Sequence, residues 1–363
     1  MLGIIFTLDY EIYGNGCGSP YKLMIKPTKK IIKLFDNYGA KLTIMADACQ
    51  IIKYKEYYDL NKVDKFYYKK IERQLQDAIK NSHDVQLHTH SSFLNAEYKN
   101  NYWHQDWNEY DLANLNYERI YEIIKLSKNY LDKVLKEVNI IYNCNVFRAA
   151  NWSMNPSENI VRALLNNNID IDSSIFKYGK RTALVNFNYK DAYSNIVPWP
   201  VNEDNICLFK QDGKLFEFPI YCEKRKIYSF ITILRLIRLV KEILYKNRVK
   251  YGLPVVNNEE NNNKKILTKI YKNTTKMSPW KLDFNVCTGK QMINTLRNIE
   301  KKYNSNDNNL PIVMIGHSKL YNVLNKYNLE MVLQFVKANK DRYFIAKFND
   351  FEVNAFRTNS INN

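Results

Sequence analysis

The amino-acid sequence predicts an α/β fold built on a parallel β-sheet or barrel, and three observations carry the prediction. A continuous apolar run from Ile4 to Leu8 is typical of a strand buried on both faces, as in a parallel sheet. Helical segments at 26–37 and 67–81 each lead into a short strand-like segment, at 42–45 and 85–90, so strands and helices alternate. Polar and charged residues follow several of these strands, at the edge where parallel barrels hold their active sites.

The composition is that of a globular protein. The chain has 363 residues, of which 45% are hydrophobic and 25% charged, enough for one large α/β domain or two ordinary ones. Its net charge of +17 favours attraction to nucleic acid, anionic membranes or acidic glycans. The sequence holds no zinc-finger spacing or ribonucleoprotein box, which argues against a specific nucleic-acid partner.

Cysteine usage and the first residues indicate the compartment. The six cysteines are scattered and form no CxxC pair, which is typical of a reducing compartment. The segment Met1–Leu8 has no basic leader and runs into an acidic pair, so it predicts a first strand and not a signal peptide. No apolar run is long enough to cross a bilayer. We therefore expect a cytoplasmic protein, either free in solution or peripheral to the inner face of the membrane.

Two carboxylates close the first strand. Asp9 and Glu11 are two residues apart, so both side chains project from one face at the carboxyl end of the strand. Solvated strand ends also carry acids, but acids that close a buried strand are less easily dismissed than surface acids. Catalytic residues of parallel α/β barrels lie at this edge, which makes both residues candidates for a functional site.

The stretch 82–90 holds three of the five histidines in the chain. Its pattern predicts a strand in which His88 and His90 project from the same face. Imidazole nitrogens bind zinc and other first-row metals, usually together with a carboxylate. The two residues are therefore either ordinary strand-end histidines or metal ligands, and a carboxylate on a neighbouring strand would favour the second interpretation.

Two further strands end in polar groups. A helix at 117–135 precedes a strand at 146–153 that carries Arg148. The strand at 169–174 ends in the acid Asp172 and two hydroxyls. Both strands continue the alternation of the first third of the chain, so their ends are expected at the same edge of the sheet.

Aromatic residues in two loops are candidates for contact with sugar rings. The loop 102–110 is rich in tryptophan and tyrosine, and its rings either stack on a sugar or only cover the rim of the barrel. In the rigid loop 197–200, prolines flank Trp199, which we expect to present its ring to a glycan.

The middle of the chain predicts a strand at 215–220, a helix from 224 to 246 and, in the Asn-rich run 256–265, a loop. The helix is amphipathic, and it either lies in the interface of an anionic membrane or packs its apolar side on the protein. Its apolar side holds Phe230, Ile233, Leu236, Ile237, Val240 and Leu244, and its basic side holds Arg235, Arg238, Lys241 and Lys246.

The last part of the chain predicts a helix at 289–302, a strand at 311–316, a helix at 321–337 and a strand at 343–346. His317 directly follows the first of these strands. Its imidazole titrates near neutral pH, so it is either a proton donor at the catalytic edge or an ordinary loop histidine.

Four segments resemble, in their order and spacing, the motifs of the polysaccharide deacetylase superfamily, the NodB-homology carbohydrate esterases. They are 6–11, 83–90, 147–153 and 171–174. The chain is most similar to a cytosolic branch with an aspartate–aromatic–glutamate first motif and a QLHxH second motif, and the resemblance resumes at His317. It implies a distorted (β/α) barrel, one divalent metal, commonly zinc, and hydrolysis of an N-acetyl group on a sugar.

The resemblance also implies a set of metal ligands. Glu11 would take the place of the metal carboxylate, and His88 matches the first histidine of the second motif. The family commonly has its second histidine four residues later, where this chain has Ser92, so His90 would replace it. Asp9 and Glu11 could also exchange roles.

For the reaction, the resemblance implies that Asp9 is the general base, that Arg148 holds it in its ionised form, and that His317 is the general acid. A glycine often found after the third motif is Ala150 here, which would narrow the adjoining pocket. We expect four residues to contact the substrate: Asn151, Trp152, Trp199 and Asp172.

The sequence thus predicts a metal-dependent deacetylase, with zinc as its metal, that acts on an N-acetylated sugar or glycan in cell-envelope or surface-polysaccharide metabolism. We expect a single barrel domain over 1–363, with a helical insertion and loop at about 223–285. The alternatives are a non-catalytic glycan-binding or scaffold protein, which Ser92 and Ala150 favour, and a related barrel amidase or glycosidase with paired carboxylates. The helix at 224–246 is the expected contact with an anionic membrane surface.

Overall fold

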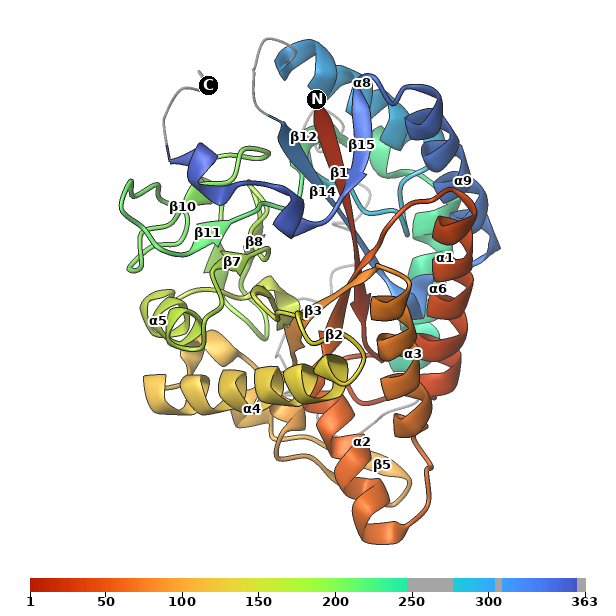
Figure 1. Cartoon of the computed structure of the whole chain (residues 1–363), viewed down its shortest axis with the longest axis vertical. Coiled ribbons are helices and arrows are strands. Elements are labelled where there is room, and N and C mark those ends of the chain that lie inside the picture. Colours follow the sequence, from red (N-terminus) through yellow and green to blue (C-terminus); the bar gives the residue numbers. More distant parts are fainter. Residues whose placement is uncertain (247–276, 304–308, 358–363) are drawn as a thin grey trace, which may run out of the picture.

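A curled and almost entirely parallel β-sheet of nine strands forms the centre of the protein (Figure 1). The computed structural model describes residues 1–246, 277–303 and 309–357. The strands of the sheet are β1 (Leu2–Tyr10), β2 (Thr43–Asp47), β3 (Asp84–Thr89), β6 (Val146–Ala149), β7 (Ile171–Asp172), β10 (Trp199–Pro200), β11 (Phe216–Glu217), β14 (Leu310–His317) and β15 (Tyr343–Ala346). Their order is β10-β11-β7-β6-β3-β2-β1-β14, and β15 pairs with the first half of β1.

The sheet closes into a distorted barrel because the chain beyond β11 crosses to β14. Ile220 forms a parallel bridge with Val313, and the backbone N–H of Tyr221 donates to the Val313 carbonyl at 3.1 Å. Strands from opposite ends of the sheet order are thereby joined. The predicted fold class, a distorted (β/α) barrel, is confirmed.

Helices between the strands cover the outside of the sheet (Figure 1). In α1, for example, Ile31, Leu34 and Phe35 share one face and are buried, and the ring of Phe35 meets that of Phe6 on β1 edge to face at 5.1 Å. The α-helices are α1 (Lys26–Asn37), α2 (Ala48–Asn61), α3 (Tyr68–Lys80), α4 (Tyr117–Lys136), α5 (Glu158–Asn166), α6 (Ile233–Lys246), α8 (Gly289–Tyr303) and α9 (Val323–Ala338). None of the described helices combines the length and apolar character needed to cross a membrane.

The predicted start of the helix at residue 224 is wrong. Residues Cys222–Lys226 form the strand β12, which pairs antiparallel with β13 (Met277–Lys281), and the α-helix begins only at Ile233. The pairing partner lies about fifty residues further along the chain, so local periodicity gave no sign of it. The Asn-rich run 256–265 lies outside the described residues, and the single domain over 1–363 stays a prediction.

The register of the parallel strands brings the predicted polar residues to one edge. Asp9 on β1 is paired with His317 on β14, Asp47 on β2 with His88 on β3, and His88 in turn with Arg148 on β6. All of these strands run in the same direction, so their carboxyl ends meet. The segments that resemble the deacetylase motifs are therefore neighbours in space.

Gly316, the residue before His317, packs directly against an aromatic ring. A Cβ atom at this position would lie 2.0 Å from ring carbons of Phe284. We expect Gly316→Ala to force the ring or the strand to move and to lower the free energy of unfolding by about 1–3 kcal/mol, measured by denaturant titration.

Gly14→Ala is the matched control for this substitution. The nearest atom to its Cβ would lie at 3.7 Å, an ordinary contact distance. We expect its stability to stay within about 0.5 kcal/mol of the parent protein. Equal losses in the two variants would contradict the explanation.

Candidate active site

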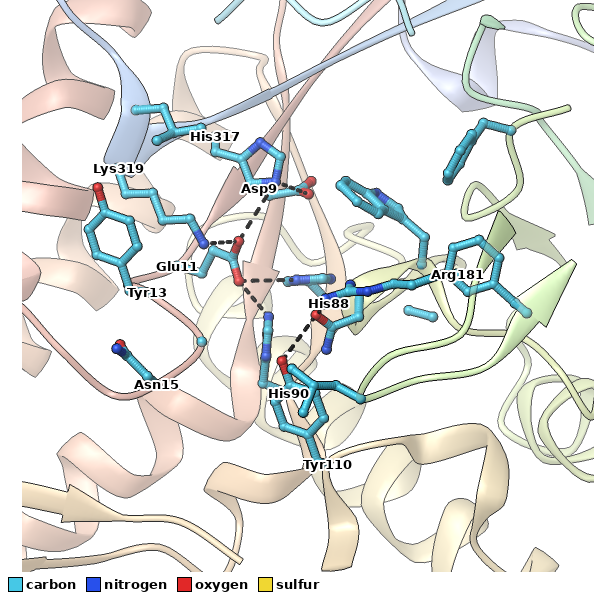
Figure 2. A pocket seen from close by; sticks show the side chains of 18 of the residues that line it. Asp9, Glu11, Tyr13, Asn15, His88, His90, Tyr110, Arg181, His317 and Lys319 are labelled. Carbon is cyan, nitrogen blue, oxygen red and sulfur yellow. Dashed lines mark hydrogen bonds and ion pairs between the residues drawn. The ribbon is translucent and has the colours of Figure 1, made fainter. Parts of the chain in front are cut away.

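A cleft of about 500 Å³ opens at the carboxyl ends of β1, β3 and β14 (Figure 2). Its floor is acidic and imidazole-rich, and aromatic and basic side chains form its walls. Seven of the residues that the sequence singled out line it: Asp9, Glu11, His88, His90, Asn151, Trp152 and His317.

Glu11 faces two imidazoles with a single carboxylate oxygen. Its Oε2 lies 2.5 Å from Nε2 of His90 and 3.6 Å from Nε2 of His88, and all three residues are buried (Figure 2). Their potential ligand atoms lie within 4.8 Å of one another. Two imidazole nitrogens and one carboxylate are a donor set found in catalytic zinc sites, so these residues fit a bound metal.

A hydrogen bond of His88 sets its tautomer. Its Nδ1 lies 2.8 Å from the backbone carbonyl of Arg148, which can only accept, so Nδ1 carries the proton. When the ring is neutral, as a metal ligand must be, its lone pair therefore resides on Nε2, the atom that faces Glu11. Metal-binding histidines usually have such a second partner, which orients the ring.

Asp9 and His317 form a second cluster that shares Glu11. Nε2 of His317 lies 3.4 Å from Oδ2 of Asp9 and 3.9 Å from Oε1 of Glu11. Asp9, Glu11 and His317 also lie close enough together to hold a cation. The structure thus contains two possible ligand sets around one glutamate.

The anchoring of each carboxylate separates these two sets. Oδ1 of Asp9 accepts from Arg148 at 2.8 Å, which leaves Oδ2 for His317. Oε1 of Glu11 accepts from Lys319 at 2.6 Å, which leaves Oε2 for the two imidazoles. Glu11 is therefore the better metal carboxylate, and Asp9 is the better partner of His317.

Lys319 is a site residue that the sequence did not identify. Its ammonium group donates to Glu11 and, at 3.1 Å, to the backbone carbonyl of Ile12. It lies two residues beyond His317, and a His-x-Lys spacing after a buried strand was the signal that could have found it. A second cation thereby stands beside the acidic floor.

The electrostatics of the floor follow from burial and from these cations. Burial alone would raise the pKa of Asp9, but Arg148 and then His317 outweigh it and hold that pKa below its usual range. Burial of Glu11 is likewise outweighed, chiefly by Lys319 and His90, so its pKa lies well below the usual range. Both carboxylates are therefore ionised at neutral pH.

The pKa values of His88 and His317 shift in opposite directions. Burial opposes protonation of His88, but its contact with Glu11 and the charge of Asp9 prevail and raise its pKa to about 9. Burial dominates at His317 and lowers its pKa to about 4, so this imidazole is neutral at pH 7.

Arg148 lies beneath the cleft and not in its wall. It is fully buried, and its Nη1 donates to Asp9 and to Thr7 Oγ1, both at 2.8 Å. Its Nε donates to the carbonyl of Ser173 at 2.8 Å, and Nη2 to the hydroxyl of the same residue at 3.1 Å. The guanidinium orients Asp9, as the sequence motif implies.

Asn151 and Trp152 shape one wall of the cleft with a strained backbone. Their φ values are 55° and 59°, a left-handed conformation that side chains rarely adopt. The ring of Trp152 stands perpendicular to that of His317 at 6.1 Å, and Oδ1 of Asn151 accepts from the Tyr110 hydroxyl at 3.2 Å. These contacts hold a ring and an amide at the mouth of the cleft.

The structure does not bring Trp199 and Asp172 to the cleft. Trp199 is fully buried, and its indole N–H donates inward to the carbonyl of Ile206 at 3.0 Å. Asp172 is fully buried as well, and its carboxylate accepts from the Ser174 hydroxyl at 2.7 Å. Both side chains are packed in the core, which the sequence pattern does not reveal, and neither lines the cleft.

Ser92, at the usual position of the second histidine, does not contribute to the floor of the cleft either. Its buried hydroxyl donates to Oε1 of Gln105 at 2.8 Å. In the aromatic loop, Tyr110 lines the cleft, whereas Trp103 packs against Phe66 in the core at 4.9 Å. Of these two rings, only that of Tyr110 is placed where it could contact a sugar.

Comparison with known proteins gives likeness of fold. No protein-family model and no curated protein matches the chain. Among solved structures, 4-alpha-glucanotransferase from Thermococcus litoralis is similar with a TM-score of 0.51 and 13% identity, over 96% of this chain and 40% of that one. A protein described as a polysaccharide deacetylase from Mycobacterium smegmatis gives 0.49 and 12%, over 96% and 88%. An allantoinase gives 0.48 and 10%, over 98% and 89%.

At 13% identity the likeness to the glucanotransferase extends to the fold alone, and it agrees with the barrel described above.

His88→Ala tests the metal site. We expect it to weaken metal binding by more than about tenfold, because loss of even an outer partner of a metal ligand costs about 10–100-fold in affinity. Metal content is measured by elemental analysis after dialysis against a metal buffer. The control is His104→Ala, an exposed histidine on β5 (Tyr102–His104) outside the cleft, which should bind metal like the parent. Equal metal content in both variants would rule out this ligand set.

Proposed function

We propose that the protein is a metal-dependent deacetylase that hydrolyses the N-acetyl group of a sugar in cell-envelope or surface-polysaccharide metabolism. The observation that supports this most directly is that Glu11 and Asp9 face different imidazoles. Its Oε2 faces His88 and His90, while the neighbouring Asp9 faces His317. Amide hydrolysis needs both parts, a site for a cation and an acid–base pair beside it.

Glu11, His88 and His90 are the proposed ligands, and Zn²⁺ is the ion that this donor set suits best. When bound, such an ion lowers the pKa of a water molecule and polarises the amide carbonyl. All six cysteines are free thiols, and five of them are buried, which supports the proposal that the protein works in the cytoplasm.

Asp9 is the proposed general base. Arg148 keeps its carboxylate ionised and occupies Oδ1, so that Oδ2 remains to accept a proton from the attacking water. A base that is ionised at neutral pH and fixed in one orientation needs no reorganisation before it acts.

His317 is the proposed general acid, but its pKa of about 4 corrects the expectation that it titrates near neutral pH. Its imidazole is neutral in the free site, so it receives its proton during the reaction. Its Nε2 faces Oδ2 of Asp9 at 3.4 Å, which supports transfer of the proton taken from water. The same nitrogen then protonates the departing amine of the sugar, and acetate is the second product.

The proposed substrate contacts are Asn151 and Trp152, since both line the cleft. Trp152 offers a ring to the apolar face of a sugar, and Asn151 and the neighbouring Arg181 offer polar groups to its hydroxyls.

The pKa shifts of Asp9 and Glu11 argue against glycosidic chemistry in this cleft. A glycosidase needs one carboxyl group that begins the reaction protonated, and such a group has a raised pKa. Asp9 and Glu11 both have lowered pKa values, so neither suits that role. The likeness of fold to a 4-alpha-glucanotransferase therefore does not imply that the carboxylates of this cleft act on a glycosidic bond.

The test is acetate release from N-acetylated oligosaccharides by the zinc-loaded protein. Acetate with an intact sugar chain is the expected result. Shortened oligosaccharides without acetate would indicate a glycosidase, and saturable sugar binding without turnover would indicate a glycan-binding protein. Either outcome would overturn the proposal.

Substitution of His317 separates chemistry from metal binding. We expect His317→Ala to lower kcat by about 10²–10⁴-fold, the range that general acid–base groups contribute. Metal content should match that of the parent, because the proposed ligands are untouched. His104→Ala again serves as the control with full activity, and parental turnover in His317→Ala would remove this residue from the mechanism.

A further inference from the structure

The outward face of α6 is apolar. The exposed residues recur at helical spacing along one side, so they form a continuous stripe. Each of them exposes between 48% and 64% of its surface: Ile233, Leu236, Leu239, Val240, Ile243 and Leu244. The stripe continues into the preceding turn, where Tyr228 and Ile231 are 67% and 81% exposed. Soluble proteins rarely leave an apolar surface of this extent without a partner.

Three basic residues of α6 have partners within the protein. Arg235 lies over the ring of Phe230 at 4.6 Å, and Nη1 of Arg238 lies 3.3 Å from Oδ2 of Asp283. The ammonium group of Lys241 donates to the carbonyl of Leu320 at 3.3 Å. The helix is therefore oriented so that these three cations have partners within the fold and its apolar side is exposed.

A groove of about 620 Å³ between α1 and α9 is strongly basic. Within the described ranges none of its lysines forms an ion pair, and all of them are exposed. Five lysines line it: Lys22, Lys26, Lys30, Lys33 and Lys326. Like charges at this spacing repel one another, so binding of an anionic surface would relieve the repulsion between the lysines.

The groove adjoins the helix α6, which carries the stripe. Lys241 of α6 also donates to the carbonyl of Tyr321 at 3.5 Å, and Tyr321 lines the groove together with the exposed Val323. Figure 1 shows α1, α6 and α9 on the same side of the view. The helix also borders the cleft, since Arg238 and Leu320 belong to the lining of the cleft.

We propose that the apolar stripe of α6 and the lysine groove form one docking surface for an anionic lipid bilayer. The stripe would enter the boundary between headgroups and acyl chains, and the lysines would face the anionic headgroups. This inference does not rest on the proposed deacetylase activity.

Two other occupants suit the surface less well. A second copy of the chain would bring another net charge of +17 against the same lysines, which disfavours self-association. Nucleic acid would neutralise the lysines but would leave the apolar stripe exposed to water. An anionic bilayer satisfies both features at once.

Vesicle sedimentation of the full-length protein tests the proposal. The parent should sediment with vesicles of phosphatidylcholine and phosphatidylglycerol, and far less with phosphatidylcholine alone. Leu236→Glu/Leu239→Glu should lower the partition coefficient by more than about tenfold. Lys26→Glu/Lys30→Glu should lower it by about fivefold for each lysine that is replaced.

Matched controls carry the same change in charge elsewhere on the surface. Ile140→Glu/Ile141→Glu replaces two side chains that are 83% and 84% exposed after α4, and Lys210→Glu/Lys214→Glu reverses two exposed lysines. The isoleucine control should sediment like the parent. The lysine control, Lys210→Glu/Lys214→Glu, should have a higher partition coefficient than Lys26→Glu/Lys30→Glu. Circular dichroism establishes that each variant is folded.

Three outcomes would overturn the proposal. The first is that Leu236→Glu/Leu239→Glu sediments like the parent, and the second is that the test and control variants lose binding equally. The third is that light scattering shows a dimer of the parent and a monomer of Leu236→Glu/Leu239→Glu, while neither protein binds vesicles. Acetate release from a soluble oligosaccharide should be the same in the parent and in Leu236→Glu/Leu239→Glu, so a failure of docking and a failure of the enzymatic proposal are distinguishable.

Discussion

The buried guanidinium of Arg148 is the interaction on which the rest of the site depends. It donates to Thr7 and Asp9 on β1 and to Ser173 after β7, while the backbone carbonyl of Arg148 accepts from His88 on β3. One residue thereby fixes the relative positions of strands that are far apart in the sequence. Burying a cation without such partners costs several kcal/mol, roughly, so these strands cannot shift independently.

A second constraint is that two buried carboxylates stand side by side. Each of them has its own cation, Arg148 for Asp9 and Lys319 for Glu11. The pairing also occupies one oxygen of each carboxylate and leaves the other for the imidazoles. Similar side chains thus acquire different surroundings through their partners, as the proposed roles of one as metal carboxylate and the other as base require.

Much of this arrangement was predictable because parallel strands end at a common edge. Asp9, His88 and His317 each follow or close a buried apolar run, and the pattern of the runs is visible in the sequence. The side chain of Trp199 was not predictable, because whether a loop ring points inward depends on the packing around it. The strand β12 was missed for a related reason, since its partner β13 lies far along the chain.

Lys319 has a consequence for assembly of the protein. Together with Arg148, it supplies positive charge to the acidic floor from the chain itself, so the two carboxylates can be enclosed before any ion arrives. A protein that relied on the ion for this compensation would exist in native form only when loaded. Here the barrel can be completed first, and an ion bound at the proposed site would enter afterwards.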